Sequence, residues 1–308
     1  MTSRDDRDCR RSRRRRPLGW AAALVVAVLG SSCAVEFHLG DKYDSQVGAT
    51  ATEAAADGTL TPAVAVSGTP LIVEDFDGTT LDADVWNTCH WWDDGGCTIA
   101  TNDELEWYLP GQVRVRDGTL VLTAEKRTTV GADGTAFPYR SGMVSTGPPE
   151  WNAEPKVAFT YGAVEVRFRA PLGAGAWPAI WMLPASQESR PEIDLFEAVG
   201  QRPRRVGMYF HPGDDSDRRT SFTHFHLPEG EDLSDTHTVR LHWSRELLEF
   251  VFDGEKVWEV TGEQVPDEPM YLVINLAVGG SYGGTPDPSA FPATFEIDHV
   301  RIWSEGAL

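Results

Sequence analysis

The chain has 308 residues, of which 41% are hydrophobic and 24% are charged, and its formal net charge is −20. This composition is that of a folded globular protein, and the length suits one large domain or two small ones. Because so acidic a chain repels nucleic acid and gains no attraction to anionic membranes, an uncharged ligand fits it better than a polyanion does.

The first 33 residues have the pattern of an export signal, which predicts an extracellular or envelope-anchored protein. Arg13 to Arg16 form a basic stretch, and an apolar run from Leu18 to Leu29 follows it. This run is shorter than the roughly 20 residues that a membrane-spanning helix needs, but it suits a signal peptide. Small residues precede Cys33, as in bacterial lipoprotein signals. Lipidation at Cys33 and ordinary cleavage nearby are therefore both open.

Residues 34–70 are rich in Ala, Thr, Gly and Val without any periodicity, so we expect a flexible spacer there. Beyond it, Cys89 and Cys97 lie in the segment NTCHWWDDGGC, with a Gly-Gly pair between them. In an exported protein this spacing predicts a local disulfide. A metal site would need more Cys or His ligands close by than His90 alone.

From Leu71 onward, short segments alternate apolar and polar residues between clusters of Gly, Pro, Asp or Asn. Two Asp-Gly pairs, at 117–118 and 253–254, stand between such segments and indicate β-hairpins. No segment of comparable length has a convincing helical repeat, so we predict an all-β sandwich that forms one domain over residues 71–308. The expected strands lie within residues 112–126, 161–171, 237–260, 269–280 and 294–303.

The segment RPEIDLFEAVG places Glu192, Asp194 and Glu197 in an otherwise apolar run. Glu192 and Asp194 share one face of a strand, but Glu197 is an odd number of residues from Glu192 and would face the other way. A β-bulge between Asp194 and Glu197 reverses this parity and brings all three acids to one face. An exposed strand with scattered acids and metal binding by the three acids are the alternatives.

Two carboxylic acids on either side of a sugar bond are the equipment of glycoside hydrolysis, one as nucleophile and one as general acid/base. A third acid between them repels both and raises the pKa of one partner, which keeps that partner protonated. The spacing therefore favours a glycosidase.

The motif EIDLFE resembles the E-x-D-x-x-E signature of glycoside hydrolase family 16, in its bulged, laminarinase-like branch. The segments YGAVEVRFRAP, GAWPAIWMLP, INLAVGG and IDHVRIW resemble further blocks of that family in the same order. The resemblance implies a concanavalin A-like jelly-roll sandwich of two curved antiparallel sheets. It also implies that Glu192 is the nucleophile, that Asp194 assists it, and that Glu197 is the general acid/base.

Aromatic faces pack against sugar rings, so Trp177 and Trp181 are candidates for the substrate groove, although both also suit the core. The resemblance adds further candidate substrate contacts: Asn102, Glu106, Arg140, His211 and Asn275. The resemblance also implies that catalysis needs no cofactor and that a structural calcium ion binds away from the catalytic acids. The candidate calcium ligands are Glu74 or Asp75, the Gly118 carbonyl and Asp298.

Together these features predict a secreted, monomeric, endo-acting hydrolase of β-1,3-glucan or mixed β-1,3-1,4-glucan that retains anomeric configuration. Three alternatives remain open. They are a transglycosylase, a galactan hydrolase of the same fold, and a non-catalytic glucan-binding protein.

Overall fold

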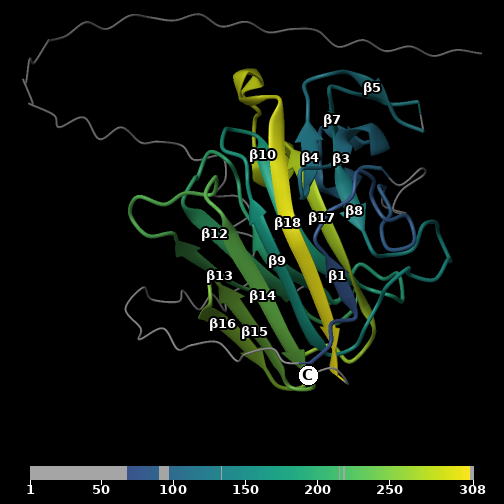
Figure 1. Ribbon diagram of the computed structural model, residues 1–308, viewed down its shortest axis with the longest axis vertical. Helices are drawn as coiled ribbons and strands as arrows, with labels where there is room; N and C mark the ends of the chain where they lie inside the picture. Colours follow the sequence, from purple (N-terminus) through teal and green to yellow (C-terminus); the bar gives the residue numbers. More distant parts are fainter. Residues whose placement is uncertain (1–67, 90–96, 133, 215, 218, 306–308) are drawn as a thin grey trace, which may run out of the picture. The chain divides into compact units, whose positions relative to one another are not determined.

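The computed structural model describes residues 68–89, 97–132, 134–214, 216–217 and 219–305, and Figure 1 shows their arrangement. Two large antiparallel sheets form the domain, which confirms the all-β prediction. The predicted signal sequence, Cys33 and nearly all of the predicted spacer lie outside the described residues. In the part of the chain that is described, no helix is both long and apolar enough to span a membrane.

The six-stranded sheet has the strand order β13-β12-β11-β10-β17-β8. Its strands, in chain order, are β8 (Met143–Ser145), β10 (Ala176–Pro184), β11 (Glu192–Glu197), β12 (Arg205–His211), β13 (Ser221–His226) and β17 (Met270–Val278).

The eight-stranded sheet has the order β16-β15-β14-β9-β18-β4-β3, and β1 pairs with β18 beside this path. Its strands are β1 (Ile72–Glu74), β3 (Val113–Arg116), β4 (Thr119–Ala124), β9 (Gly162–Arg169), β14 (His237–Ser244), β15 (Leu247–Phe252), β16 (Glu255–Thr261) and β18 (Ala293–Ser304).

Short elements complete the described part of the domain. Two small sheets pair β2 (Glu106–Tyr108) with β7 (Tyr139–Ser141) and β5 (Thr129–Val130) with β6 (Ala136–Phe137). The helical segments are η1 (Ala100–Asn102), η2 (Pro110–Gln112), α2 (Gly280–Gly283) and η3 (Pro288–Ala290).

The predicted hairpins are present as β3–β4 and β15–β16. Asp117 and Gly118 have φ of 52° and 74°, and Asp253 and Gly254 have φ of 49° and 86°. Positive φ at both central residues is the geometry of a type I′ turn, whose twist matches that of the flanking strands. Asp-Gly pairs adopt it at low cost, which explains why the sequence located these turns.

The hydrophobic core contains side chains from both large sheets. On β9, Val164, Val166 and Phe168 are fully buried, whereas Arg167 between them is exposed, as the alternation in the sequence predicted. The Phe168 ring lies 4.4 Å, centroid to centroid, from that of Phe196 on β11 in the other sheet. Burying each such ring contributes about 1.5–3 kcal/mol, so this contact holds β11 firmly against the core.

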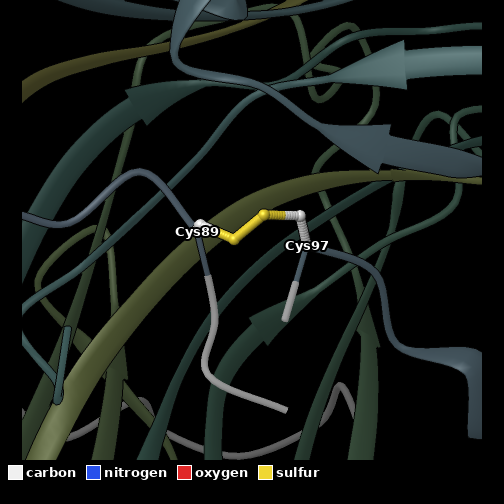
Figure 2. Close-up of a disulfide and its surroundings, with 2 residues drawn as sticks. All are labelled: Cys89 and Cys97. Carbon is white, nitrogen blue, oxygen red and sulfur yellow. A yellow bond between two sulfur atoms is a disulfide. The ribbon is translucent and has the colours of Figure 1, made fainter. Parts of the chain in front are cut away.

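The predicted disulfide joins Cys89 and Cys97, whose Cα atoms are 4.9 Å apart (Figure 2). Just after it, the Cys97 carbonyl accepts a hydrogen bond from the Tyr108 amide. The disulfide therefore links Cys89 to Cys97, whose carbonyl is hydrogen-bonded to Tyr108 on β2. Tyr108 belongs to the candidate site.

Candidate active site

The central feature of the candidate site is a β-bulge in β11. Asp194 is opposite Tyr209 and Glu197 is opposite Gly207 on β12, so three residue steps on β11 match two on its neighbour. The pairing with β10 shifts at the same place. Since the core holds Ile193, Leu195 and Phe196, the bulge leaves the acids on the opposite face of the sheet. The predicted bulge is confirmed.

Each acid has a defined neighbour on the adjoining strands. The Trp177 indole N–H donates to Glu197 Oε1 at 3.0 Å. Asp194 is 3% exposed, and its Oδ2 lies 3.3 Å from His211 Nε2. His211 is opposite Glu192 in the strand register, and one ligand atom from each of Glu192, Asp194 and His211 lies within 4.8 Å of the others.

The His211 ring is held from its other side by the Thr220 hydroxyl, which lies 2.8 Å from Nδ1. Burial lowers the pKa of His211, so its neutral form is favoured. A neutral imidazole fixed between Thr220 and Asp194 can exchange a hydrogen bond with Asp194 without adding a full positive charge to the acids.

All three acids hold protons more tightly than ordinary carboxyl groups. Burial, followed by the charge of Asp194, raises the pKa of Glu192 to about 8. Burial raises the pKa of Asp194 to about 7. Burial, followed by the charges of Asp194 and Glu192, raises the pKa of Glu197 well above its usual range. Three like charges this close cannot all ionise near neutral pH.

The protonation states of the three acids suit the roles of a general acid and a nucleophile. The raised pKa of Glu197 favours its protonated form, which a general acid requires. Glu192 and Asp194 are close neighbours, and their raised pKa values of about 8 and about 7 favour one proton shared between the two carboxyl groups near neutral pH. When that proton is on Asp194, Glu192 is a free carboxylate.

Aromatic side chains flank the acids on the same face of the sheet. Trp181 pairs with Asp194 in register, and it belongs to a buried cluster with Tyr108 and Tyr271. Trp177 belongs to a second cluster, in which its ring centroid is 5.3 Å from that of Tyr282. Both clusters are separate from the core between the sheets, so both tryptophans belong to the acidic face and not to that core.

A hydrogen-bonded group near Glu197 has its members on β12, β13 and α2. The Tyr209 hydroxyl is 2.8 Å from the Tyr282 hydroxyl and 2.7 Å from His224 Nε2. A Cβ on Gly207, opposite Glu197, would lie 2.8 Å from the Tyr209 ring, so glycine is what lets this ring pack there. No pattern in the sequence indicated this network, because its members come from three separate segments.

A second network connects Trp181 to buried acids in the segment before β3. The Trp181 indole N–H donates to Asn275 Oδ1 at 2.8 Å, and Asn275 Nδ2 donates to the Tyr108 hydroxyl at 2.9 Å. That hydroxyl donates to Glu104 Oε2 at 3.1 Å. Sequence reasoning selected Asn275 but missed Glu104 and Tyr108. The alternation of polar residues in NDELEWY was the available signal.

The other predicted substrate contacts differ in position. Asn102 is partly exposed and donates to Glu104 Oε1 at 3.1 Å. Glu106 is fully buried, where its Oε2 accepts the Val278 amide at 2.8 Å, so it supports the fold of the site from within. Arg140 forms an ion pair with Glu125 at 2.6 Å. Substrate contact by any of these residues stays a prediction.

Metal binding by the three acids is a weaker interpretation of this geometry. The group whose ligand atoms converge consists of Glu192, Asp194 and His211 and leaves out Glu197. Glu197 instead faces the Trp177 N–H, a donor that cannot ligate a metal. The arrangement of all three acids is explained better by proton chemistry.

The predicted calcium ligands are Glu74 or Asp75, the Gly118 carbonyl and Asp298. The carboxylates among them are engaged in other contacts. Asp298 on β18 is paired with Arg167 at 3.5 Å and Arg169 at 3.2 Å, and Asp75 is paired with Arg301. The Glu74 carboxylate accepts from the Phe76 amide and the Trp86 indole. Since these donors already satisfy the acids, the set does not favour a cation, and calcium binding stays a prediction.

Comparison with known proteins agrees with this geometry. The family model for glycosyl hydrolases family 16 matches residues 101–301. Glucan endo-1,3-beta-glucosidase A1 of Niallia circulans is 34% identical over 271 residues, which cover 78% of this chain and 39% of that protein. Endo-1,3-1,4-beta-glycanase EglC of Rhizobium meliloti is 31% identical over 71% of this chain and 48% of that protein. The chain thus spans less than half the length of these curated relatives.

A solved structure shows the same fold. The X-ray structure of the endo-beta-1,3-glucanase from Pyrococcus furiosus is 31% identical and superimposes with a TM-score of 0.68, covering 76% of this chain and 93% of that one. The predicted jelly-roll class of the sandwich is thereby confirmed.

Proposed function

Since this chain belongs to glycosyl hydrolase family 16, we propose that it is an endo-acting, retaining hydrolase of β-1,3-glucan or mixed β-1,3-1,4-glucan. The bulged strand β11, which gathers Glu192, Asp194 and Glu197 on one face, is the observation that carries the proposal. Relatives described as a glucan endo-1,3-beta-glucosidase and an endo-1,3-1,4-beta-glycanase support the choice of glucan as substrate.

In the proposed reaction, Glu192 attacks the anomeric carbon while Glu197 protonates the departing glycosidic oxygen. A covalent glycosyl-enzyme intermediate results, with Glu197 now ionised. Glu197 then removes a proton from water, the water displaces Glu192, and both residues return to their starting states. Two displacements at one carbon leave the anomeric configuration unchanged.

Asp194 acts on Glu192 by taking the proton that the two carboxyl groups share, which leaves Glu192 ionised for attack. His211, 3.3 Å from Asp194, and Thr220 behind it hold Asp194 in place. The Trp177 N–H stabilises Glu197 in its ionised state, which the second half of the reaction requires. The aromatic rings beside the acids supply faces for sugar rings.

The test is incubation of the purified full chain with laminarin, lichenan and agarose, followed by measurement of new reducing ends. We expect release from laminarin and its loss by roughly 10²–10⁴-fold in Glu197→Gln, the range of general acid/base contributions. Glu192→Ala is expected to be inactive. Glu165→Gln, which changes a half-buried acid on the opposite sheet, is the control and retains activity. A Glu192→Ala variant with wild-type activity would refute the assignment.

The products separate the alternatives. A hydrolase yields only shorter chains, whereas a transglycosylase also yields chains longer than the substrate. Endo action lowers viscosity before many reducing ends appear, and NMR of the first product shows whether the β configuration is retained. Cleavage of agarose alone would indicate a galactan hydrolase, and binding of laminarin without cleavage would indicate a glucan-binding protein.

We further propose that the protein acts outside the cytoplasm, either free or attached to the envelope through a lipid on Cys33. The signal-like residues 1–33 support export, and the disulfide between Cys89 and Cys97 suits an oxidising compartment. Mass spectrometry of the mature N-terminus in wild type and Cys33→Ala decides between these forms. A cytoplasmic protein that keeps its first 33 residues would contradict export.

A further inference from the structure

The network behind Trp181 has a single consistent direction of hydrogen bonding. An indole N–H can only donate, so the Asn275 group that faces Trp181 is its carbonyl oxygen. The Asn275 amide nitrogen then donates to the Tyr108 hydroxyl. Because Tyr108 receives this bond, its own proton is free to be donated onward, to Glu104 at 3.1 Å. The chain of donors therefore ends on the Glu104 carboxyl group.

Glu104 accordingly has to accept hydrogen bonds on both oxygens. Asn102 Nδ2 donates to Oε1 and the Tyr108 hydroxyl to Oε2, both at 3.1 Å. Burial raises the pKa of Glu104, and its side-chain hydrogen bonds, first with Glu106 and then with Asn102 and Tyr108, oppose that rise. A group supplied only with donors is satisfied best as an ionised carboxylate.

Glu106 has the opposite environment. Its Oε2 accepts the Val278 amide at 2.8 Å, but its buried Oε1 meets no N–H or O–H donor among the described residues. The side chains nearest to it are Glu104 and Tyr108. Because the single Tyr108 hydroxyl proton is donated to Glu104 Oε2, Glu104 is left as the hydrogen-bonding partner of Glu106. A buried oxygen beside a carboxylate, with no donor of its own, is satisfied if it carries a proton and donates it.

We infer that Glu106 is a neutral carboxylic acid that donates to the Glu104 carboxylate, and that this pair is a positioning device for Trp181 beside the three proposed catalytic acids. Glu104 and Glu106 are held there because Leu105 between them donates its amide to the Val278 carbonyl on β17. Burial also raises the pKa of Glu106 well above its usual range, in agreement with a protonated side chain.

The position of Trp181 links this device to the chemistry, and this link rests on the proposed function. Trp181 is opposite Asp194 in the strand register, so its ring orientation sets the surface next to Asp194 and Glu192. The charge of Glu104 also acts on the site directly, since it contributes to the raised pKa of Glu197. One proton on Glu106 thus keeps a single negative charge in the pair, located on Glu104.

Three substitutions in the full chain test this assignment. In Glu106→Gln, the amide nitrogen donates permanently to Glu104 and the amide oxygen accepts the Val278 amide, so every bond is kept. Glu106→Ala removes the donor. In Glu104→Gln, an amide nitrogen replaces one of two accepting oxygens, so a hydrogen bond from Asn102 or Tyr108 is lost.

We expect kcat/KM on laminarin to fall about tenfold or more in Glu106→Ala, because a buried bond to a charged group is lost. Glu106→Gln is expected to restore it to within about threefold of wild type, whereas Glu104→Gln remains low. The titratable groups facing the pair are Tyr108 and, from β11, Glu197. Removing the Glu104 charge lowers the pKa of Glu197, so the alkaline limit of kcat/KM moves to lower pH in Glu104→Gln only.

Two readouts need no activity. Infrared spectra in heavy water should lose one protonated carboxyl band in Glu106→Gln relative to wild type. The indole N–H resonance of Trp181, assigned from a Trp181→Phe variant, should keep its position in Glu106→Gln and move in Glu106→Ala. An unchanged carboxyl band, or a Glu106→Gln variant as impaired as Glu106→Ala, would overturn the inference. Failure of the wild type to cleave any glucan would instead overturn the proposed function. The infrared and NMR spectra would then still test whether Glu106 is protonated.

Discussion

The indole N–H of Trp177 offers a direct test of Glu197 as the proposed general acid. Trp177→Phe keeps a ring in the cluster with Tyr282 and removes the 3.0 Å bond to Glu197 Oε1. That bond favours the ionised form of Glu197, so its loss raises the pKa of Glu197 further. The acid then stays protonated to higher pH, and the alkaline limit of kcat/KM moves upward.

The magnitude follows from the bond that is lost. A hydrogen bond to a charged group contributes about 1.5–3 kcal/mol, and each pKa unit corresponds to about 1.4 kcal/mol. Two effects make the pKa shift smaller than this full contribution. The indole N–H also bonds to the protonated acid in part, and water can replace it at the half-buried Glu197 in the variant. We therefore expect an upward shift of about one pH unit. The acid limit, which reflects ionisation of Glu192 and Asp194, should stay in place.

The assay is the pH dependence of kcat/KM on laminarin for wild type, Trp177→Phe and a matched control. Trp86→Phe is that control, because the Trp86 indole also donates to a carboxylate, Glu74 Oε2 at 3.4 Å, but one on β1 of the other sheet. It should lower stability without moving the alkaline limit. An alkaline limit that stays fixed or moves downward in folded Trp177→Phe would refute the assignment of Glu197 as the acid.

Three further predictions concern stability. Gly162 has a φ of +139°, and a Cβ there would overlap a backbone carbonyl of β18, so Gly162→Ala should lower the urea-derived unfolding free energy by roughly 3 kcal/mol; a loss within error of zero would contradict this. Cys89→Ser opens a short loop closed through Cys97 and should cost roughly 2–3 kcal/mol, which wild type in reductant should match. Burial alone would lower the pKa of His237, but its hydrogen bonds, first to Asp253, raise it overall. That stabilisation is present below the unfolded pKa of about 6.5 and is lost as pH rises through the folded value; His237→Gln should therefore cost more at about pH 5 than at about pH 9, and an equal cost would refute it.

Much of the local structure could be predicted from neighbouring residues alone. The alternation along β9 and the Asp-Gly turns at 117–118 and 253–254 follow from side-chain parity and from φ preferences. The bulge in β11 was inferred because parity alone would put Glu197 on the face opposite to Glu192 and Asp194. Such features need only a few consecutive residues and solvent on one side. With that bulge inferred, the three acids could be assigned to one face before any strand had a known neighbour.

The surroundings of the acids were decided by tertiary structure. His211 meets Asp194 because β12 pairs with β11 in one register, and the Trp177 N–H meets Glu197 because β10 lies on the other side. Register between separate strands depends on how both faces pack, which no short segment encodes.

The carboxyl pair illustrates the same limit over a longer distance. Glu104 and Glu106 are ordinary surface-type residues in sequence, and they become a buried pair only because their segment docks on β17 near Val278. The hydrogen-bond donors that this docking supplies determine which carboxyl group of the pair carries the proton. They thereby also determine the charge next to Glu197. The sequence by itself thus identified the candidate catalytic residues, and packing between distant segments decided where their protons are held, because burial and hydrogen-bonding partners govern the pKa.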